Sequence, residues 1–232
     1  MNFKNKKIMV VVAHPDDEVL GIGATIHKLV HEEKAEVHVV VLGEGLTSRD
    51  GQKDQSKELE MHRKCILDAQ KCLGYQSVGI HQLADNRFDS IDLLDIVKII
   101  ENEKKAFKPD YVFTHHMGDL NIDHRRTFEA VMTATRPMVE ESVIGVFSFE
   151  TFSATEWAFQ VDSKGFRPNF FVSINQENLK AKQDAMQSYI FETREYPHPR
   201  SVRALEVFAR ANGCKFGSEF IEAFEIIRLK LQ

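Results

Sequence analysis

The sequence has few cysteines, and none of them has the spacing of a thiolate metal site. Only three of the 232 residues are cysteine, namely Cys65, Cys72 and Cys214, and no two of them form a C-x-x-C pair. An odd number without such a pair argues against a disulfide framework and against a zinc site built from cysteines. Any metal that this chain binds must therefore be held by histidine and carboxylate side chains.

Long apolar runs and an excess of basic residues are missing as well. No uninterrupted apolar run approaches the roughly 20 residues that cross a bilayer, and the run after residues 1–7 is too short for a secretory signal. The formal net charge of −5 offers no concentrated basic face for nucleic acid. We therefore expect a cytoplasmic protein with no membrane span and no nucleic-acid partner. The sequence leaves the oligomeric state open, and a homo-oligomer is compatible with it.

The sequence does contain a regular alternation of strand and helix patterns. Strand patterns cover residues 7–13, 36–45, 77–83, 110–116, 143–152, 169–175 and about 224–229. Helix patterns cover residues 18–34, 57–73, 90–107 with Ser90 as N-cap, 123–137, 176–191 and 201–212 with Ser201 as N-cap. This alternation predicts an α/β fold, a Rossmann-like, doubly wound and mostly parallel sheet with helices on both faces. We find no repeat or linker, and we expect a single domain over residues 1–232.

Two clusters of histidine and acid follow the first and fourth predicted strands. Residues 13–18 read AHPDDE, and residues 114–126 read THHMGDLNIDHRR. In doubly wound sheets these two strands are neighbours where the strand order reverses, and ligands bind beyond the carboxyl ends of the strands at that point. The clusters should therefore meet, although about a hundred residues separate them. The side chains expected to converge are His14, Asp16, Asp17, Asp119, Asp123 and His124.

The chemistry of these clusters indicates a metal site. Several adjacent carboxylates at the end of a buried strand are costly unless a cation offsets their charge. Two histidines and one carboxylate are a common ligand set for catalytic Zn²⁺, and a neighbouring acid then remains available as a general base for water. The alternative is that the acids only cap two helices, which accounts for one acid per helix but not for three acids and a histidine together. The residues alone thus indicate metal-assisted hydrolysis.

AHPDDE followed at this distance by DLNIDH resembles the PIG-L/LmbE superfamily of metal-dependent sugar N-deacetylases. The resemblance covers about residues 1–135, which would form the Rossmann-like core, so that residues from about 136 to 232 would complete the substrate pocket. It implies that His14, Asp17 and His124 bind Zn²⁺, with Fe²⁺ as the alternative metal, and that Asp16 is the general base.

The resemblance also suggests supporting groups and one departure from the family pattern. Asp123 and Glu18, each beside an expected ligand, would belong to the shell that orients the site. The commonest family form of the second motif is His-Pro-Asp-His, whereas this sequence has Asn121 at the first histidine. Asn121 can donate a hydrogen bond to an oxyanion but cannot shuttle a proton. The acid that protonates the leaving amine is then either Asp16 or His198, in the segment YPHPRS.

The remaining predictions concern the substrate. The residues expected to contact it are His62, Arg63, Arg87, Asp119 and Arg200. The alternative for His62 and Arg63 is that they lie on a solvated helix face without contacting the substrate. The alternative for the HPRS segment is that it only forms a turn before a helix.

The resemblance implies a zinc-dependent hydrolase that removes an N-acetyl group from an N-acetylglucosamine-type conjugate, a small molecule. The two alternatives are an amidase for a thiol conjugate or other non-sugar amide with the same metal site, and a non-catalytic nucleotide-binding Rossmann module. The GIGATI segment lacks the third glycine of a dinucleotide motif.

Overall fold

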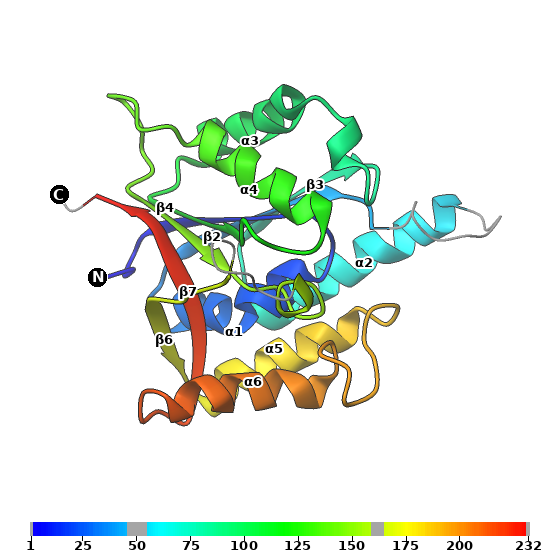
Figure 1. The fold of residues 1–232 in the computed structure, drawn as a ribbon, viewed down its shortest axis with the longest axis vertical. Coiled ribbons are helices and arrows are strands. Elements are labelled where there is room, and N and C mark those ends of the chain that lie inside the picture. The colour runs from blue at the N-terminus through cyan, green and yellow to red at the C-terminus, as the bar shows by residue number, and fades with distance from the viewer. Residues whose placement is uncertain (1, 46–54, 159–164, 231–232) are drawn as a thin grey trace.

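The computed structural model describes residues 2–45, 55–158 and 165–230, which are built around one seven-stranded sheet (Figure 1). Its strands are β1 (Lys7–Val12), β2 (Glu36–Gly43), β3 (Ser77–Leu83), β4 (Tyr111–His115), β5 (Gly145–Phe149), β6 (Phe170–Ile174) and β7 (Phe220–Leu229). Their order across the sheet is β3-β2-β1-β4-β5-β7-β6. The first five strands in that order are parallel, and β7 runs antiparallel to both β5 and β6. The predicted α/β class and mostly parallel sheet are confirmed.

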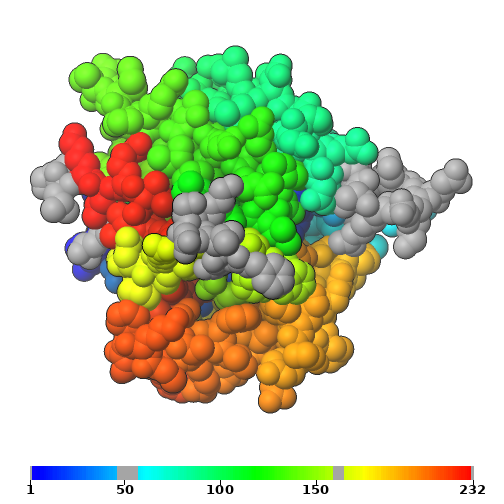
Figure 2. Space-filling model, viewed as in Figure 1, coloured from blue at the N-terminus to red at the C-terminus, as the bar shows by residue number. Residues whose placement is uncertain are grey.

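Helices cover both faces of the sheet, as predicted (Figure 1). One face carries α1 (Asp17–His31), α2 (Gln55–Leu73), α5 (Gln176–Ser188) and α6 (Val202–Cys214), and the other carries α3 (Leu93–Phe107) and α4 (Ile122–Ala134). Two short 3₁₀ helices, η1 (Phe88–Ser90) and η2 (Glu156–Ala158), lie in loops. Because both faces are covered, β1 and β2 are almost wholly buried and are mainly apolar, with Lys7, Glu36 and His38 as the polar residues. In the space-filling view the orange residues, which include those of α6, form the lower part of the molecule (Figure 2).

Several predicted boundaries differ from the structure by a few residues, two of them for a clear reason, and one predicted cap is confirmed. Ser90 was expected to cap the helix at 90–107, but α3 begins at Leu93 after Asp92, because η1 ends at Ser90 and Ile91 is extended. The last strand begins at Phe220, four residues before the predicted start, since residues 220–224 pair with β6 before residues 224–229 pair with β5. Ser201 caps α6 as predicted, accepting the backbone N–H of Ala204 at 3.1 Å.

The sheet topology determines where a site can form. β1 pairs with β2 on one side and with β4 on the other, so the strand order reverses between β1 and β4. The loops that follow these two strands therefore lie side by side at one edge of the sheet, as predicted. No helix in the described part of the chain combines the length and apolarity needed to cross a membrane.

Candidate metal centre and active site

The loop between β1 and α1 holds the first cluster in a constrained conformation. Asp16 occupies the N-cap position of α1 with φ 98°, the left-handed region, and its side chain does not cap the helix. A residue other than glycine is strained there, and such strain occurs where surrounding contacts enforce it. Asp17, the first residue of α1, accepts the backbone N–H of His14 at 2.8 Å through Oδ2. The helix-capping alternative for these acids therefore does not describe Asp16.

His14, Asp17 and His124 converge as the sequence predicted. One ligand atom from each lies within 4.8 Å of the others. Asp17 Oδ2 is 3.5 Å from His14 Nδ1 and 3.3 Å from His124 Nε2. Ligand atoms at about 2.0–2.1 Å from a tetrahedral Zn²⁺ are roughly 3.3 Å apart, so these separations fit one divalent ion. All three side chains are buried.

Each histidine of this group also contacts a carboxylate through its other ring nitrogen. His14 Nε2 lies 2.9 Å from Asp123 Oδ2 and 3.0 Å from Asp85 Oδ1, and His124 Nδ1 lies 3.1 Å from Asp119 Oδ1. Pairing of a histidine with a carboxylate behind it is the usual arrangement around ligating imidazoles, because it fixes the tautomer and the ring orientation. Sequence reasoning missed Asp85, although its position just after β3 at the same sheet edge was an available signal.

The charges around the two histidines favour a bound cation. Burial opposes protonation of His124, but Asp17 and Asp119 raise its pKa to about 9. Burial likewise opposes protonation of His14, but its hydrogen bonds to Asp123, Asp17 and Asp85 raise its pKa well above the usual value. For Asp17, burial is outweighed by the neighbouring histidines, which hold its pKa well below the usual range. The same negative field that favours imidazolium would stabilise a divalent metal.

His115 lies beneath the cluster and has a structural role. Its Nε2 accepts the backbone N–H of Ala13 at 2.9 Å, and its Nδ1 lies 3.0 Å from the Thr151 hydroxyl. Its ring stacks on that of His124, with centroids 3.9 Å apart. Burial and the nearby His124 lower the pKa of His115 to about 4, so it is neutral. It ties the carboxyl ends of β1 and β4 together.

Asp16 lies beside the cluster and faces a guanidinium. Arg200 Nη1 is 3.2 Å from Asp16 Oδ2 and 2.8 Å from Glu192 Oε2. Burial raises the pKa of Asp16 well above the usual value, and Arg200 opposes that rise. The backbone N–H of Asp16 donates to Glu18 Oε2 at 3.2 Å, and Glu18 Oε1 accepts the Tyr189 hydroxyl at 2.6 Å. Burial raises the pKa of Glu18 to about 7.

A polar cavity of about 160 Å³ opens beside these groups. Its walls are formed by His14, Pro15, Asp16, Gly45, Asp85, Asn86, Asn121, Glu192 and Arg200. Asn121 caps α4, because its Oδ1 accepts the backbone N–H of Asp123 at 2.8 Å. Its amide nitrogen donates to Asn86 Oδ1 at 3.3 Å. Glu192, which sequence reasoning missed, follows α5 and carries no motif that would have marked it.

Asp119 and Arg87, predicted to contact the substrate, and His198, predicted as a candidate acid, lie outside this lining. Asp119 is 1% exposed and lies under His124, where its oxygens also accept the Asn121 N–H and the Thr155 hydroxyl. His198 accepts the backbone N–H of Arg200 at 3.1 Å, and burial and two nearby arginines lower its pKa. Arg87 is exposed on the loop after β3.

The two candidate residues on α2 lie apart from the histidine–aspartate cluster. His62 is buried and stacks on Phe191, with ring centroids 5.4 Å apart. Arg63 is exposed and, with His62, lines a second cavity.

The fold and the site together define an α/β protein of Rossmann type in which the ligand atoms of two histidines and an aspartate lie within 4.8 Å of one another, a spacing that fits a metal ion. Residues 9–135 match the family model PIG-L, GlcNAc-PI de-N-acetylase. The chain belongs to this family and is a deacetylase, a hydrolytic enzyme. The family match contains every residue of the predicted metal group.

Relatives support the assignment of fold and family. The chain is 28% identical over 192 residues to the uncharacterized deacetylase YaiS of Escherichia coli (strain K12), covering 80% of this chain and 91% of that protein. It shares its fold with N,N'-diacetylchitobiose deacetylase from Pyrococcus horikoshii (TM-score 0.72, 20% identity, 96% and 84% of the two chains). The chain also shares its fold with GalB, the 4-carboxy-2-hydroxymuconate hydratase of Pseudomonas putida KT2440 (TM-score 0.73, 18% identity, 98% of each chain).

Proposed function

We propose that this deacetylase removes the N-acetyl group from an N-acetylglucosamine-type conjugate with the help of bound Zn²⁺. The observation that carries the proposal is the convergence of His14, Asp17 and His124 at separations that fit a tetrahedral ion. Fe²⁺ is the alternative metal for the same ligands. When bound, the metal supplies Lewis acidity, polarising the amide carbonyl and lowering the pKa of a water molecule.

The chain's own residues then have separate tasks. Asp123 and Asp119 orient the two histidine ligands through their second ring nitrogens. Asp16 accepts a proton from the water that attacks the carbonyl carbon, and Arg200, 3.2 Å from Asp16 Oδ2, favours its ionised form against the effect of burial. As the carbon–nitrogen bond breaks, the amine takes up a proton from Asp16, since His198, the alternative donor, lies outside the cavity lining, and acetate and the free amine leave. Asn121, in the cavity wall, donates a hydrogen bond to the developing oxyanion.

The amino-sugar substrate is supported by the family and by the lining of the cavity. The family model carries the description GlcNAc-PI de-N-acetylase, and one structural neighbour is a diacetylchitobiose deacetylase. The cavity wall is rich in carboxylate and amide groups, which suit the hydroxyls of a sugar. The same carboxylates would repel a pyrophosphate, which disfavours the nucleotide-binding alternative. An amidase for a thiol conjugate would use the same metal group.

The test measures free amine released from N-acetylglucosamine and N,N'-diacetylchitobiose by zinc-loaded protein. Asp16→Asn should keep the metal and lose about a hundredfold or more in kcat, the usual scale for a positioned general base. Asp17→Asn should lose metal. If Asp16→Asn depleted the metal while Asp17→Asn retained it, the two roles would be exchanged. Absence of amine release from both sugars, together with release from a thiol-conjugate amide, would favour the alternative amidase.

A further inference from the structure

A short turn after β5, residues 151–155, contacts two groups of the candidate site. The turn lies beside the site because β5 runs parallel to β4, so the loops that follow both strands leave the same edge of the sheet. Within it, the Thr155 hydroxyl donates to Asp119 Oδ2 at 2.6 Å. The Ser153 hydroxyl accepts the Nε–H of Arg200 at 2.7 Å. Neither hydroxyl belongs to a sequence motif, and neither has a task in the proposed reaction.

The turn is held in one conformation by its own hydrogen bonds. The backbone N–H of Thr155 donates to the Thr151 carbonyl at 2.9 Å, and the backbone N–H of Thr151 donates to the Thr155 hydroxyl at 2.8 Å. Ser153 has φ 72°, the left-handed region, and its backbone N–H donates to Glu156 Oε1 at 2.7 Å. A serine is strained there, and such strain persists where surrounding contacts enforce it, often at functional sites. This backbone conformation directs the Ser153 side chain toward Arg200.

Thr155 fixes the carboxylate that lies behind one of the expected metal ligands. Asp119 Oδ2 accepts the Thr155 hydroxyl, whereas Asp119 Oδ1 lies 3.1 Å from His124 Nδ1 and accepts the Asn121 N–H at 2.8 Å. The carboxylate is thus held at both oxygens, and its orientation sets that of the His124 ring. Thr155 and Asp119 are both buried. Loss of such support behind a ligating histidine typically costs about 10–100-fold in metal affinity.

Ser153 fixes Arg200 in the same way. The Nε–H of Arg200 donates to Ser153, while Nη1 lies 2.8 Å from Glu192 Oε2 and 3.2 Å from Asp16 Oδ2. Because a guanidinium is planar and rigid, holding Nε and Nη1 holds the whole group in its plane. Ser153 therefore keeps Arg200 in the wall of the catalytic cavity, beside Asp16.

We propose that this turn positions two parts of the active site, with Thr155 holding the His124 side of the metal centre and Ser153 holding Arg200. The inference rests on the proposed function, since it concerns the same zinc centre and the same reaction. Both residues act through another side chain, and neither lines the catalytic cavity. Because each hydroxyl has its own target, Thr155 should affect the affinity for zinc and Ser153 the turnover of the zinc-loaded enzyme. A turn that only completes the fold would give no such division.

The first experiment measures zinc affinity by competition with a chelator of known affinity. Thr155→Val keeps the side-chain shape and removes the hydroxyl, so zinc should bind about tenfold more weakly. Thr155→Ser keeps the hydroxyl and should restore wild-type affinity. The matched control is Thr127→Val on α4, which removes a buried hydroxyl that has no hydrogen-bond partner among the described residues. Its affinity should equal that of wild type. Wild-type affinity in Thr155→Val would overturn the role of Thr155.

A double-mutant cycle separates positioning from a general effect on folding. Valine also leaves the Thr151 N–H without its acceptor, so Thr155→Val should unfold at a lower denaturant concentration than wild type. In the background of Asp119→Ala, which lacks the carboxylate, Thr155→Val should have no further effect on zinc affinity. The same tenfold loss in both backgrounds would show that the change acts through the stability of the fold, and would contradict the proposal.

The second experiment measures amine release from N-acetylglucosamine by fully zinc-loaded Ser153 variants. Ser153→Ala removes the acceptor of the Arg200 Nε–H, so kcat should fall about tenfold while zinc affinity is unchanged. Ser153→Gly relieves the backbone strain and should be more stable than Ser153→Ala, but it should show the same loss in kcat. Wild-type kcat in both variants would overturn the role of Ser153, and so would a loss of zinc affinity equal to that of Thr155→Val.

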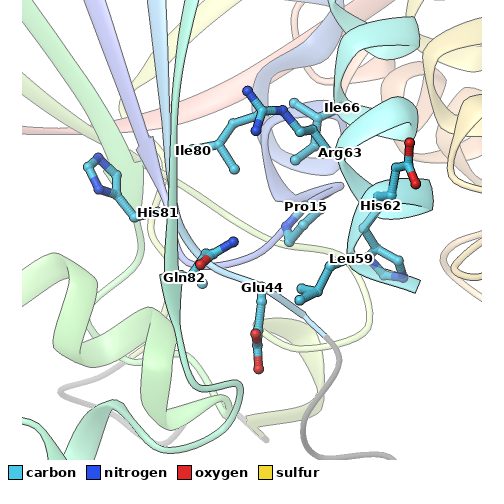
Figure 3. A pocket seen from close by; sticks show the side chains of 11 residues that line it. Pro15, Glu44, Leu59, His62, Arg63, Ile66, Ile80, His81 and Gln82 are labelled. Carbon is cyan, nitrogen blue, oxygen red and sulfur yellow. The ribbon is translucent and has the colours of Figure 1, made fainter. Parts of the chain in front are cut away.

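Failure of this inference can be distinguished from failure of the proposed function. Among the residues that the structure describes, the lining of the second cavity comes from α2, β3, the chain around the end of β2 and Pro15, not from the turn (Figure 3). Changes in the turn therefore leave that cavity intact. Zinc binding that depends on Thr155, without amine release from any N-acetylated sugar, would support the role of Thr155 and contradict deacetylation of amino sugars. Zinc-dependent amine release that none of the turn variants alters would exclude the positioning role alone.

Discussion

Replacing Arg200 with methionine removes the cation that faces the proposed general base. The guanidinium lies 3.2 Å from Asp16 Oδ2, and its side chain is 23% exposed. Two unit charges about 4 Å apart interact by roughly 4 kcal/mol at an effective dielectric constant of 20, and one pKa unit corresponds to about 1.4 kcal/mol. The largest change in the pKa of Asp16 is therefore about three units. Screening by solvent at Arg200 reduces this change, and we expect the pKa of Asp16 to rise by about one to two units.

The sign of the effect on activity follows from the role of Asp16. A general base works only when ionised, so the rate falls as the pH drops through its pKa. Loss of Arg200 raises that pKa, because burial and the nearby carboxylates then act on Asp16 without opposition. The acid limb of kcat/KM should therefore move up by about one to two pH units, while the rate at high pH is retained. The assay is amine release across a pH series, normalised to bound metal.

Two matched variants complete this test. Arg203→Met changes an exposed arginine on α6 that lies over the Tyr196 ring at 4.4 Å, and its profile should match that of wild type. Arg200→Lys keeps a cation near Asp16, so its acid limb should lie between those of wild type and Arg200→Met. An Arg200→Met enzyme with full metal content and an unmoved acid limb would refute the reasoning, since Asp16 would then not depend on Arg200.

Three further changes test other parts of the structure. His124→Ala should lose most bound Zn²⁺, because only two protein ligands remain; elemental analysis showing full occupancy would exclude His124 as a ligand. Asn121→Ala should cost about 1 kcal/mol of unfolding free energy as a lost cap and about a hundredfold in kcat as a lost oxyanion donor, whereas Asn121→Asp should restore the stability but not kcat. Lys182→Met leaves Glu222 buried without its partner at 2.5 Å and should cost about 3–5 kcal/mol in denaturant unfolding; a cost below about 1 kcal/mol would show that the ion pair does not stabilise the fold.

The meeting of the two clusters could be predicted because it depends on simple rules of topology. Strand–helix alternation predicts a parallel sheet, and the place where strand order reverses brings the ends of β1 and β4 together. His14 and Asp17 lie within a few residues of β1, and His124 lies in the first turn of α4. Residues this close to an element's end have little freedom, so a correct element assignment almost determines their positions.

Residues that reach the site from longer loops could not be predicted in this way. Glu192 follows α5 and precedes a turn, and its position 2.8 Å from Arg200 depends on how α5 and α6 pack together. His198 was expected near the pocket, but the turn directs its ring toward Trp157, with centroids 5.6 Å apart. Arg200, two residues further on, reaches Asp16 instead. A shift of two residues in a turn decides which side chain enters the cavity, and no periodic pattern records it.

Buried charges show the same division between local signals and distant partners. Lys182 lies on the apolar side of α5, between Leu179 and Met186, and a cation there is detectable in sequence as a break in the helical stripe. Its partner Glu222 lies on β7, forty residues away, and also accepts the backbone N–H of Thr25 in α1. The sequence thus reveals that a buried charge needs a partner but not which element supplies it. At the metal centre the strand order answers that question, whereas elsewhere only the packed structure does.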